Sequence, residues 1–373
     1  MQIAQQLKVT RKTVRLWLEN NTYHDERGWE KGKSRKYTDT AITGRIATLK
    51  KERLAKNCYF HGGEYIRMDY AKRYPKEQFP TLWFIEETIR NAGLQTRKPK
   101  QKKKGGAEYL LYPAESIRNL GYIHQSADFI GKKYIAGRNE PVNIFSSSYY
   151  SPFKLYEIAR IEAEKATYAI EQLIHQWRTY PLPDVFRIDN GLQFRGTARG
   201  KRSVGVFLKF LLNLDVTPLF GSPSKPWTNP HVEGHNRVFN EKVWNKNFFT
   251  SLEQIDRECE RFNQESKELF TFRYARLIVN TPFRYLEKNQ NIITDRLVST
   301  KGKKMYFTRF VESWDTKTKA FIIVLNETIF LPEKYNHQFV FVEWNLGKEL
   351  LSIYSEYKKD ITLIKEIKFR INL

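Results

Sequence analysis

The stretch Val-Phe-Arg-Ile-Asp-Asn-Gly-Leu-Gln-Phe, residues 185–194, says more about the fold class of this chain than any other. Its first four residues form a short, mostly apolar run that predicts a buried strand. Asp189 follows that run directly, and Asn190-Gly191 then supplies a tight turn. The stretch therefore predicts a carboxylate held where a strand gives way to a loop.

Two other acidic residues lie in comparable surroundings. Asp128 belongs to Gly-Tyr-Ile-His-Gln-Ser-Ala-Asp-Phe-Ile, residues 121–130, and follows a second strand-like run. Glu233 belongs to Lys-Pro-Trp-Thr-Asn-Pro-His-Val-Glu-Gly-His-Asn, residues 225–236. Asn229 is the expected N-cap of a helix in that stretch, so Glu233 should lie just inside the helix.

Oxygen-only ligand sets are typical of sites for hard cations such as Mg²⁺ or Mn²⁺. Two such ions roughly 3.5–4 Å apart can stabilise the attacking and the leaving oxygen of a phosphoryl transfer. Each of the three carboxylates taken alone is more often an ordinary surface group. Their shared context predicts one metal site made by Asp128, Asp189 and Glu233.

The same residues carry a resemblance to a known family. Asp-Asn-Gly-x-Gln-Phe, followed 44 positions after its Asp by the Glu of Asn-x-x-x-Glu-x-x-Asn, resembles the retroviral-integrase-type catalytic core of DDE transposases. The resemblance implies an RNase H-like fold, a five-stranded mixed α/β sheet with helices on both faces. It also implies Asp128, Asp189 and Glu233 as catalytic residues that hold two Mg²⁺ (or Mn²⁺) ions. The chain departs from the family pattern at Pro230, where members often have Gly, and in the first motif, where only Asp128 and its strand context match.

The charge balance favours a polyanionic partner. The chain of 373 residues holds 64 Lys and Arg against 41 Asp and Glu, a formal net charge of +23. Residues 1–104 alone hold 25 of the basic and 11 of the acidic residues. An uneven basic excess is the electrostatic footprint of nucleic-acid binding, with a generic charged surface as the alternative.

Other features narrow the class of protein. Cys58 and Cys259 lie far apart and suggest no disulfide framework, which fits a reducing compartment. No apolar run has the length of a membrane span, and no Gly-x-x-x-x-Gly-Lys-Ser/Thr motif occurs. Neither a membrane nor a nucleotide is therefore an expected partner. Together with the resemblance, this predicts a cytoplasmic, nucleoid-associated bacterial protein.

Residues 1–22 predict a helix-turn-helix. Thr10 is the expected N-cap of the second helix, and Val14, Trp17 and Leu18 recur with helical spacing and should pack inward. The exposed face of that helix would present four residues to DNA: Arg11, Lys12, Thr13 and Arg15. A further helix normally precedes such a unit, so the unit is either trimmed at its start or begins here at an internal start codon. An ordinary helical hairpin is the alternative.

Residues 36–96 predict a second DNA-binding unit, helical or winged-helix, with a purely structural helical domain as the alternative. Ile42, Ile46 and Leu49 repeat with helical spacing, and Gly93 supplies the residue that ends a later helix.

A basic linker is expected over residues 97–114. Residues 97–104 contain six positive charges, whose repulsion should keep the chain extended. Lys102, Lys103 and Lys104 close this run and would contact the DNA backbone without reading its sequence.

Residues 115–280 predict the catalytic core, and residues 298–373 predict a small β-barrel. The core alternates strand-like and helix-like segments at 123–130, 142–150, 164–177, 185–189, 204–214 and 216–220. Such an order argues for a mixed α/β layer fold. Beyond the core, short β-rich runs separated by turns favour a small all-β module. Asn236 and Asn240 should share the helix face of Glu233 and orient DNA or water.

Two histidine patterns do not predict zinc sites. His231 and His235 flank Glu233, but the motif His-Glu-x-x-His places its Glu directly after the first His. At about 100° per residue, Glu233 points away from both histidines, which argues against a metalloprotease. Cys58 and His61 lack a second ligand pair, so the zinc-binding domain of retroviral integrases is not indicated either.

These observations predict a metal-dependent DNA transposase that cleaves the ends of a mobile element and joins them to target DNA. Two ends must be cut together, so a homo-oligomer, at least a dimer, is expected on DNA. The alternatives are a catalytically inactive, transposase-derived DNA-binding regulator and an RNase H-like endonuclease without strand transfer.

Overall fold

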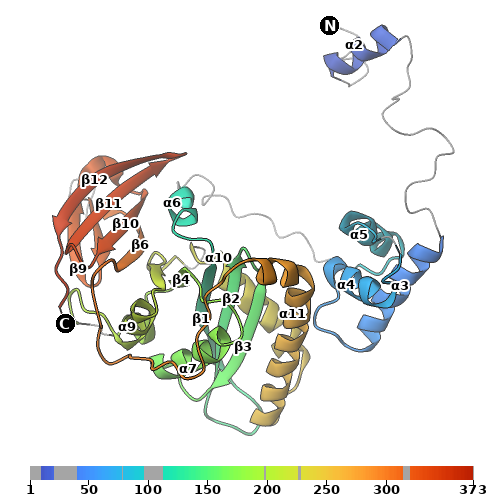
Figure 1. Cartoon of the computed structure of the whole chain (residues 1–373), viewed down its shortest axis with the longest axis horizontal. Helices are drawn as coiled ribbons and strands as arrows, with labels where there is room; N and C mark the ends of the chain where they lie inside the picture. The colour runs from blue at the N-terminus through green and yellow to red at the C-terminus, as the bar shows by residue number, and fades with distance from the viewer. Residues whose placement is uncertain are drawn as a thin grey trace. The chain divides into compact units, whose positions relative to one another are not determined.

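The computed structural model describes residues 10–20, 40–77, 79–95, 112–196, 199–225, 228–313 and 320–372 (Figure 1). The chain separates into two compact units. One unit contains residues 1–56 and 61–96, and the other contains residues 57–60 and 97–373. None of the helices in these described ranges has the length and apolar character needed to span a membrane.

The front helix, α2 (Arg11–Asn20), begins where the sequence predicts. The hydroxyl of Thr10 accepts a hydrogen bond from the backbone N–H of Thr13 at 3.2 Å, which is the expected N-cap. Lys12 and Arg15 are exposed, so the helix presents these two cations to solvent.

The predicted inward packing of the α2 side chains is only partly covered by the described residues. Leu18 is 75% exposed, so the prediction that it packs inward is wrong. Helical spacing identifies an apolar face but not the partner that covers it. The side chains of Arg11 and Trp17, and the first helix of the predicted helix-turn-helix, lie outside the described residues.

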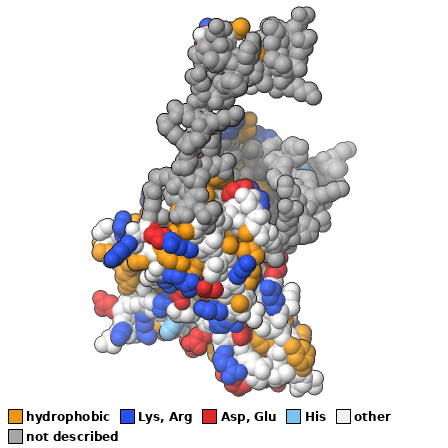
Figure 2. All heavy atoms as spheres, turned by 90° about the vertical axis from the view of Figure 1, so that its right-hand side faces the viewer, with side chains coloured by type: hydrophobic (Ala, Val, Ile, Leu, Met, Phe, Trp, Pro, Cys, Tyr) orange, Lys and Arg blue, Asp and Glu red, His pale blue; other side chains and the backbone are white. Residues whose placement is uncertain are grey.

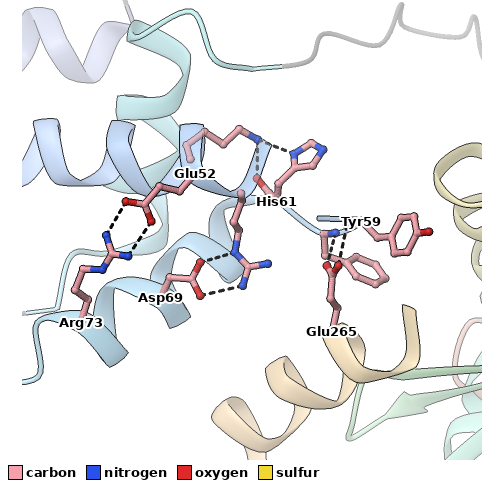
Figure 3. A network of polar contacts seen from close by, with 9 residues as sticks. Glu52, Tyr59, His61, Asp69, Arg73 and Glu265 are labelled. Atoms are coloured by element: carbon pink, nitrogen blue, oxygen red, sulfur yellow. Dashed lines mark hydrogen bonds and ion pairs between the residues drawn. The ribbon is translucent and has the colours of Figure 1, made fainter. Parts of the chain in front are cut away.

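Three helices form the remaining described part of the first unit: α3 (Thr40–Ala55), α4 (Gly63–Arg73) and α5 (Leu82–Asn91). They bury a shared group of apolar side chains: Ile46, Leu49, Ile66, Tyr70, Ile85 and Ile89. Arg73 pairs with Glu52 at 2.8 Å and ties α4 to α3 (Figure 3). Gly93 adopts a φ of +67° just past α5, as predicted for a residue that ends a helix. No strand lies among the described residues of 40–95, which match the helical rather than the winged form of the predicted unit.

The second unit is built on one mixed sheet, which in the described residues has nine strands in the order β12-β11-β10-β6-β5-β4-β1-β2-β3. The strands are β1 (His124–Lys133), β2 (Val142–Ser151), β3 (Leu155–Ile161), β4 (Val185–Ile188), β5 (Thr217–Phe220), β6 (Lys304–Phe310), β10 (Phe339–Asn345), β11 (Leu350–Tyr357) and β12 (Asp360–Lys368). Strands β1, β4, β5 and β6 are parallel to one another, and the remaining pairings are antiparallel. A separate small sheet holds β7 (Glu312–Ser313), β8 (Ala320–Val324) and β9 (Glu327–Leu331).

Helices accompany this sheet along the chain. They are α6 (Ala114–Arg118), α7 (Ala166–Trp177), α8 (Leu192–Arg195), α9 (Val206–Asn213), α10 (Pro230–Lys242) and α11 (Leu252–Asn280), with 3₁₀ turns η3 (Trp244–Lys246) and η4 (Glu333–Tyr335). The resemblance implies a five-stranded mixed sheet; β3, β2, β1, β4 and β5 are consecutive in the observed sheet, but β6, β10, β11 and β12 extend it to nine strands in the described residues. The mixed α/β class is therefore confirmed for this unit.

Alternation along β1 sends side chains to both faces of the sheet. Gln125 faces α7, where its side-chain oxygen accepts a hydrogen bond from Trp177 Nε1 at 2.8 Å. Asp128 lies three positions further and faces α10, where its Oδ2 accepts a hydrogen bond from Asn236 Nδ2 at 3.2 Å. The carboxylate predicted from the sequence therefore points to the α10 side of the sheet.

The helix α11 runs beside β3 (Figure 1). Arg160 of β3 forms two hydrogen bonds of 2.7 Å to the carboxylate of Asp256. Further along α11, Glu265 accepts the backbone N–H groups of Tyr59 at 3.0 Å and Phe60 at 2.9 Å (Figure 3). Neither β3 nor α11 was predicted from the sequence pattern.

The C-terminal strands do not form the separate small barrel predicted over residues 298–373. Strand β6 pairs with β5 through Leu219–Tyr306 and Phe220–Phe307, and so continues the core sheet. Trp344 of β10 is fully buried in the same apolar cluster as Phe186 of β4. A pattern of short β-rich runs reveals strands but not their partners, which is why the sequence placed this region in a domain of its own.

The predicted linker residues Lys102, Lys103 and Lys104 lie outside the described residues. On the face drawn in Figure 2, Lys and Arg side chains are interspersed with acidic and hydrophobic ones. The basic excess does not form a single patch on that face.

Candidate functional site

The parallel pairing of β1 and β4 brings two of the predicted carboxylates to neighbouring positions. Ser126 of β1 pairs with Arg187 of β4. Asp128 and Asp189 each lie two residues beyond this pair. Neighbouring strands are about 4.8 Å apart, so the two residues leave the sheet side by side.

Asp128 is held on both of its carboxylate oxygens. Its Oδ1 accepts the backbone N–H of Phe129 at 2.9 Å, and its Oδ2 accepts Asn236 Nδ2 at 3.2 Å. Asn236 lies three residues after Glu233 on α10, and residues three apart share a helix face. The bond from Asn236 therefore places the face that carries Glu233 over Asp128.

His235 fixes the rotation of α10 about its axis. Its ring is fully buried, and its Nδ1 lies 2.9 Å from the hydroxyl of Ser146. The ring also stacks on Tyr156 with centroids 4.5 Å apart. Burial lowers the pKa of His235 to about 3, so the imidazole is neutral near pH 7. Glu233 lies two residues before His235, so it projects from a different side of α10 and remains exposed.

Asp189 begins the turn that the Asp-Asn-Gly sequence predicts. Its Oδ1 accepts the backbone N–H of Gly191 at 2.9 Å. Asn190 Nδ2 donates to the carbonyl of Gly221 at 2.7 Å, which joins this turn to the loop after β5. The turn is thus fixed by side-chain bonds on two sides.

Arg309 of β6 supports the same turn, and nothing near it in the sequence indicated that role. Its guanidinium is buried and donates to the side-chain oxygen of Asn190 at 3.0 Å and to the carbonyl of Gly221 at 2.8 Å. Its Nε donates to the carbonyl of Ile323 at 2.7 Å. Burial lowers the pKa of Arg309 to about 9, which still leaves it cationic at neutral pH.

The three predicted carboxylates line one cavity of about 420 Å³. They come from three different elements: Asp128 from β1, Asp189 from the end of β4, and Glu233 from α10. The other lining residues are Asn190, Gly191, Gly221, Ser222, Pro223, Ser224, Lys225, Thr228 and Asn229. Neither Asn236 nor Asn240 lines this cavity, and the side-chain oxygen of each is buried without a hydrogen-bond partner among the described residues.

The electrostatics of the cavity favour a cation. The pKa of Asp128 is raised to about 7, mainly by burial and then by the charges of Asp189 and Glu233, against the opposing hydrogen bonds from Phe129 and Asn236. Burial also raises the pKa of Asp189. Carboxylates that disfavour one another's charge in this way are stabilised by a positive ion placed between them.

The donor set fits an oxygen-coordinated ion rather than a closed cage. In the described ranges, no three His, Cys, Asp or Glu side chains are grouped closely enough to enclose one metal ion. Mg²⁺ commonly binds through one or two carboxylates and keeps water and substrate phosphates as its other ligands. The assignment of Asp128, Asp189 and Glu233 as metal ligands stays a prediction on these grounds.

Two local expectations about α10 have different outcomes. The helix begins after Asn229 with Pro230 in its first turn, as predicted. The side chain of Asn229, however, makes no capping hydrogen bond, and its oxygen is buried without a partner among the described residues. Its ψ of 59° lies outside the extended region that a capping side chain requires.

Comparisons with known proteins give distant likenesses. The catalytic core domain of BIV integrase is 16% identical over 46% of this chain and 88% of that one, with a TM-score of 0.28. A simian T-cell lymphotropic virus intasome in complex with PP2A regulatory subunit B56 gamma is 10% identical over 77% of this chain and 96% of that one, with a TM-score of 0.33. No protein-family model and no curated protein matches the chain. At this distance the likenesses carry no argument about function, which has to come from the site itself.

Proposed function

We propose that this protein is a metal-dependent DNA transposase of the DDE type, which cleaves the ends of a mobile element and joins them to target DNA. One observation carries the proposal. Asp128, Asp189 and Glu233, which lie far apart in the sequence, line a single cavity. A site of three carboxylates beside a strongly basic chain is suited to phosphodiester chemistry on nucleic acid.

The residues of the cavity would have different roles in the reaction. Asp128 and Asp189 would hold the ions from the sheet, and Glu233 would complete the set from α10. Bound Mg²⁺ or Mn²⁺ would supply charge stabilisation for the attacking and leaving oxygens of the displacement. Asn236 orients Asp128 through its bond to Oδ2.

The cavity also contains a cation of its own. Lys225 lines the cavity, and its Nζ lies 4.2 Å from the ring centroid of Phe310. The cation–π contact with this ring restrains the position of the ammonium group, which can still contact a phosphate. Lys225 would therefore neutralise DNA phosphate next to the carboxylates.

DNA would be held mainly outside the cavity. Arg11, Lys12, Thr13 and Arg15 on α2 would contact the element ends, and Lys102, Lys103 and Lys104 would contact the DNA backbone. Because two ends must be processed together, the working form would be a homo-oligomer, at least a dimer, assembled on DNA.

A strand-transfer assay tests the proposal. The full chain is incubated with duplex DNA from the ends of its element, a plasmid target and Mg²⁺ or Mn²⁺. Joined products that disappear when the metal is chelated are the expected result. Nicks without joining would instead identify an endonuclease, and specific end binding with neither product would identify a DNA-binding regulator.

A further inference from the structure

A second cavity of about 470 Å³ lies next to the carboxylate cavity and plays no part in the proposed chemistry. Its lining is mainly aromatic and apolar, with a few cationic groups: Tyr112, Ala114, Ile117, Arg118, His124, Tyr150, Ser151, Arg187, Thr228, Pro230 and His231. Thr228 lines both cavities, and Asn229 and Pro230 are consecutive residues that line one cavity each. We call this second space the Arg187 cavity.

Arg187 is a buried cation, and it has no carboxylate partner in the part of the chain that the structure describes. It lies two residues before Asp189, so its side chain leaves the sheet on the face to which Asp189 belongs. Its side chain is 3% exposed, and one of its terminal nitrogens donates to the hydroxyl of Tyr112. Its Nε is buried without a hydrogen-bond partner among the described residues, and no ion pair joins Arg187 to a carboxylate there. A buried charge is retained at a cost unless an opposite charge pairs with it, so this cavity is suited to an anion.

The start of α10 also favours an anion in the Arg187 cavity. Pro230 and His231 occupy its first turn and line the Arg187 cavity. Backbone N–H groups of a first helical turn have no acceptor within the helix, and the side chain of Asn229 caps none of them. The positive end of the helix therefore borders the cavity that contains Arg187.

The same cavity offers a flat stacking surface. The rings of His231 and Tyr150 are parallel, with an interplanar angle of 4° and centroids 4.0 Å apart. His231 is exposed, whereas Tyr150 behind it is half-buried. His124 also packs edge-on against Tyr150, with ring centroids 5.5 Å apart, and helps to hold that ring in place. A rigid ring pair with one open side is the type of platform on which a nucleic-acid base stacks.

We propose that the Arg187 cavity binds one unpaired nucleotide of the DNA strand whose scissile phosphodiester lies at the carboxylate cavity. The phosphate of that nucleotide is held by Arg187 and by the start of α10, and its base stacks on the His231–Tyr150 pair. The proposal rests on the proposed function, because it assumes that DNA occupies the carboxylate cavity.

The dimensions decide between paired and unpaired DNA. A cavity of about 470 Å³ has the volume of a small-molecule site, which matches one nucleotide rather than a base pair with both of its strands. The proposed occupant is therefore a nucleotide that has left its partner. Holding it there would offset the cost of unpairing and would fix the strand on one side of the reacting bond.

The test uses 2-aminopurine, a fluorescent base whose emission falls when it stacks. The full chain is titrated, in EDTA, into an end duplex with a short unpaired extension that carries 2-aminopurine at its first position. We expect the emission to fall on binding. We also expect an abasic extension to bind roughly tenfold more weakly, as stacking of one base is worth at least that much.

Three variants separate the contributions. His231→Ala removes an exposed ring and should abolish the loss of emission while the protein stays folded. Arg187→Gln should weaken binding of the extended duplex about tenfold and leave the fully paired duplex unaffected. Arg187→Lys keeps the positive charge and should recover much of the binding, which shows that a folding defect is not the cause. Arg138→Gln, a change of the same type on the surface, should bind like the parent protein.

Unchanged emission with the parent protein, or equal quenching in His231→Ala, would overturn this proposal. Quenching by a free 2-aminopurine nucleotide to the same extent would identify a small-molecule site instead. The assay contains no metal, so its outcome is independent of catalysis. Strand transfer without quenching would support the proposed function and refute the nucleotide site. Quenching without strand transfer would support the nucleotide site and refute the proposed function.

Discussion

Arg309 donates a hydrogen bond of 3.0 Å to the side chain of Asn190, from a strand 119 residues further along the chain. Asn190 directly follows Asp189, so the position of a proposed catalytic carboxylate depends on a buried arginine of the C-terminal region. Arg309 also donates to the carbonyl of Gly221, which lines the same cavity. The C-terminal strands therefore support the site although they supply none of its carboxylates.

The first prediction concerns Arg309 itself. Arg309→Met removes a buried cation together with the hydrogen bonds it donates to the side-chain oxygen of Asn190 and the carbonyl of Ile323, while the carbonyl of Gly221 keeps the donor Asn190 Nδ2. Each buried acceptor that loses its partner costs about 1–3 kcal/mol, so the free energy of unfolding should fall by more than about 2 kcal/mol. A chemical denaturation curve measures this loss. Arg370→Met, at an exposed site, is the control and should leave the curve unchanged.

A truncation tests whether the C-terminal strands are integral to the core. A chain that ends at Asn280 loses β6, the partner of β5, together with Arg309. We expect that protein to lose its cooperative thermal transition, because the apolar cluster is shared between the two parts. A sharp transition close to that of the full chain would show that residues 281–373 form an independent module after all.

Glu157 on β3 predicts a pH dependence of stability. Burial raises the pKa of Glu157 to about 7, against the opposing hydrogen bond from Tyr180 and the charge of Lys267. A carboxyl with a raised folded-state pKa binds more protons in the folded than in the unfolded state. Its effect therefore lowers stability as pH rises from the ordinary value near 4.5 through about 7.

Glu157→Gln removes this titration and keeps the shape of the side chain. The free energy of unfolding should rise by about 1–2 kcal/mol above pH 7 and change little near pH 4. Melting curves recorded across this range measure the difference. Glu140→Gln, at an exposed site, should give no such pH-dependent gain. Equal gains at both ends of the range would contradict the assigned pKa.

The front helix predicts how the protein meets DNA. A triple variant, Arg11→Ala, Lys12→Ala and Arg15→Ala, should weaken binding of element ends, with about 1–3 kcal/mol lost for each side chain that reads a base. The salt dependence of binding should become shallower by about one unit for each phosphate contact removed. Titrations at several salt concentrations measure both effects. Parent-like binding would show that α2 does not contact the ends.

The sequence predicted the parts of this structure that depend on local chemistry. Asp189 ends a strand and Asn190-Gly191 turns the chain, because these preferences belong to the residues themselves. Thr10 caps α2 for the same reason. The strands and helices of the core were anticipated where their spacing is regular.

The rest depends on partners that lie far apart in the chain. Nothing around Arg309 indicates that it supports the turn after Asp189, because that contact exists only once β6 lies beside β5. The exposure of Leu18 and the missing cap at Asn229 likewise depend on what surrounds them. The pairing of the C-terminal strands with the core also depends on residues that lie far apart in the chain.

Strand transfer by Asp189→Asn tests most directly whether the three carboxylates form a catalytic metal site. This change keeps the size and hydrogen bonding of the side chain but removes its charge. We expect nearly normal DNA binding with no cleavage and no joining, and the same result for Asp128→Asn and Glu233→Gln. Double variants should be no worse than single ones, as expected for residues that act as one unit.

Asp215→Asn is the matched control, because it makes the same chemical change at an exposed residue outside the cavity. It should join DNA as the parent protein does. The decisive quantity is therefore the amount of Mg²⁺-dependent joined product from Asp189→Asn relative to Asp215→Asn. We expect no joined product from Asp189→Asn, and substantial joining by this variant would show that Asp189 is not a catalytic metal ligand.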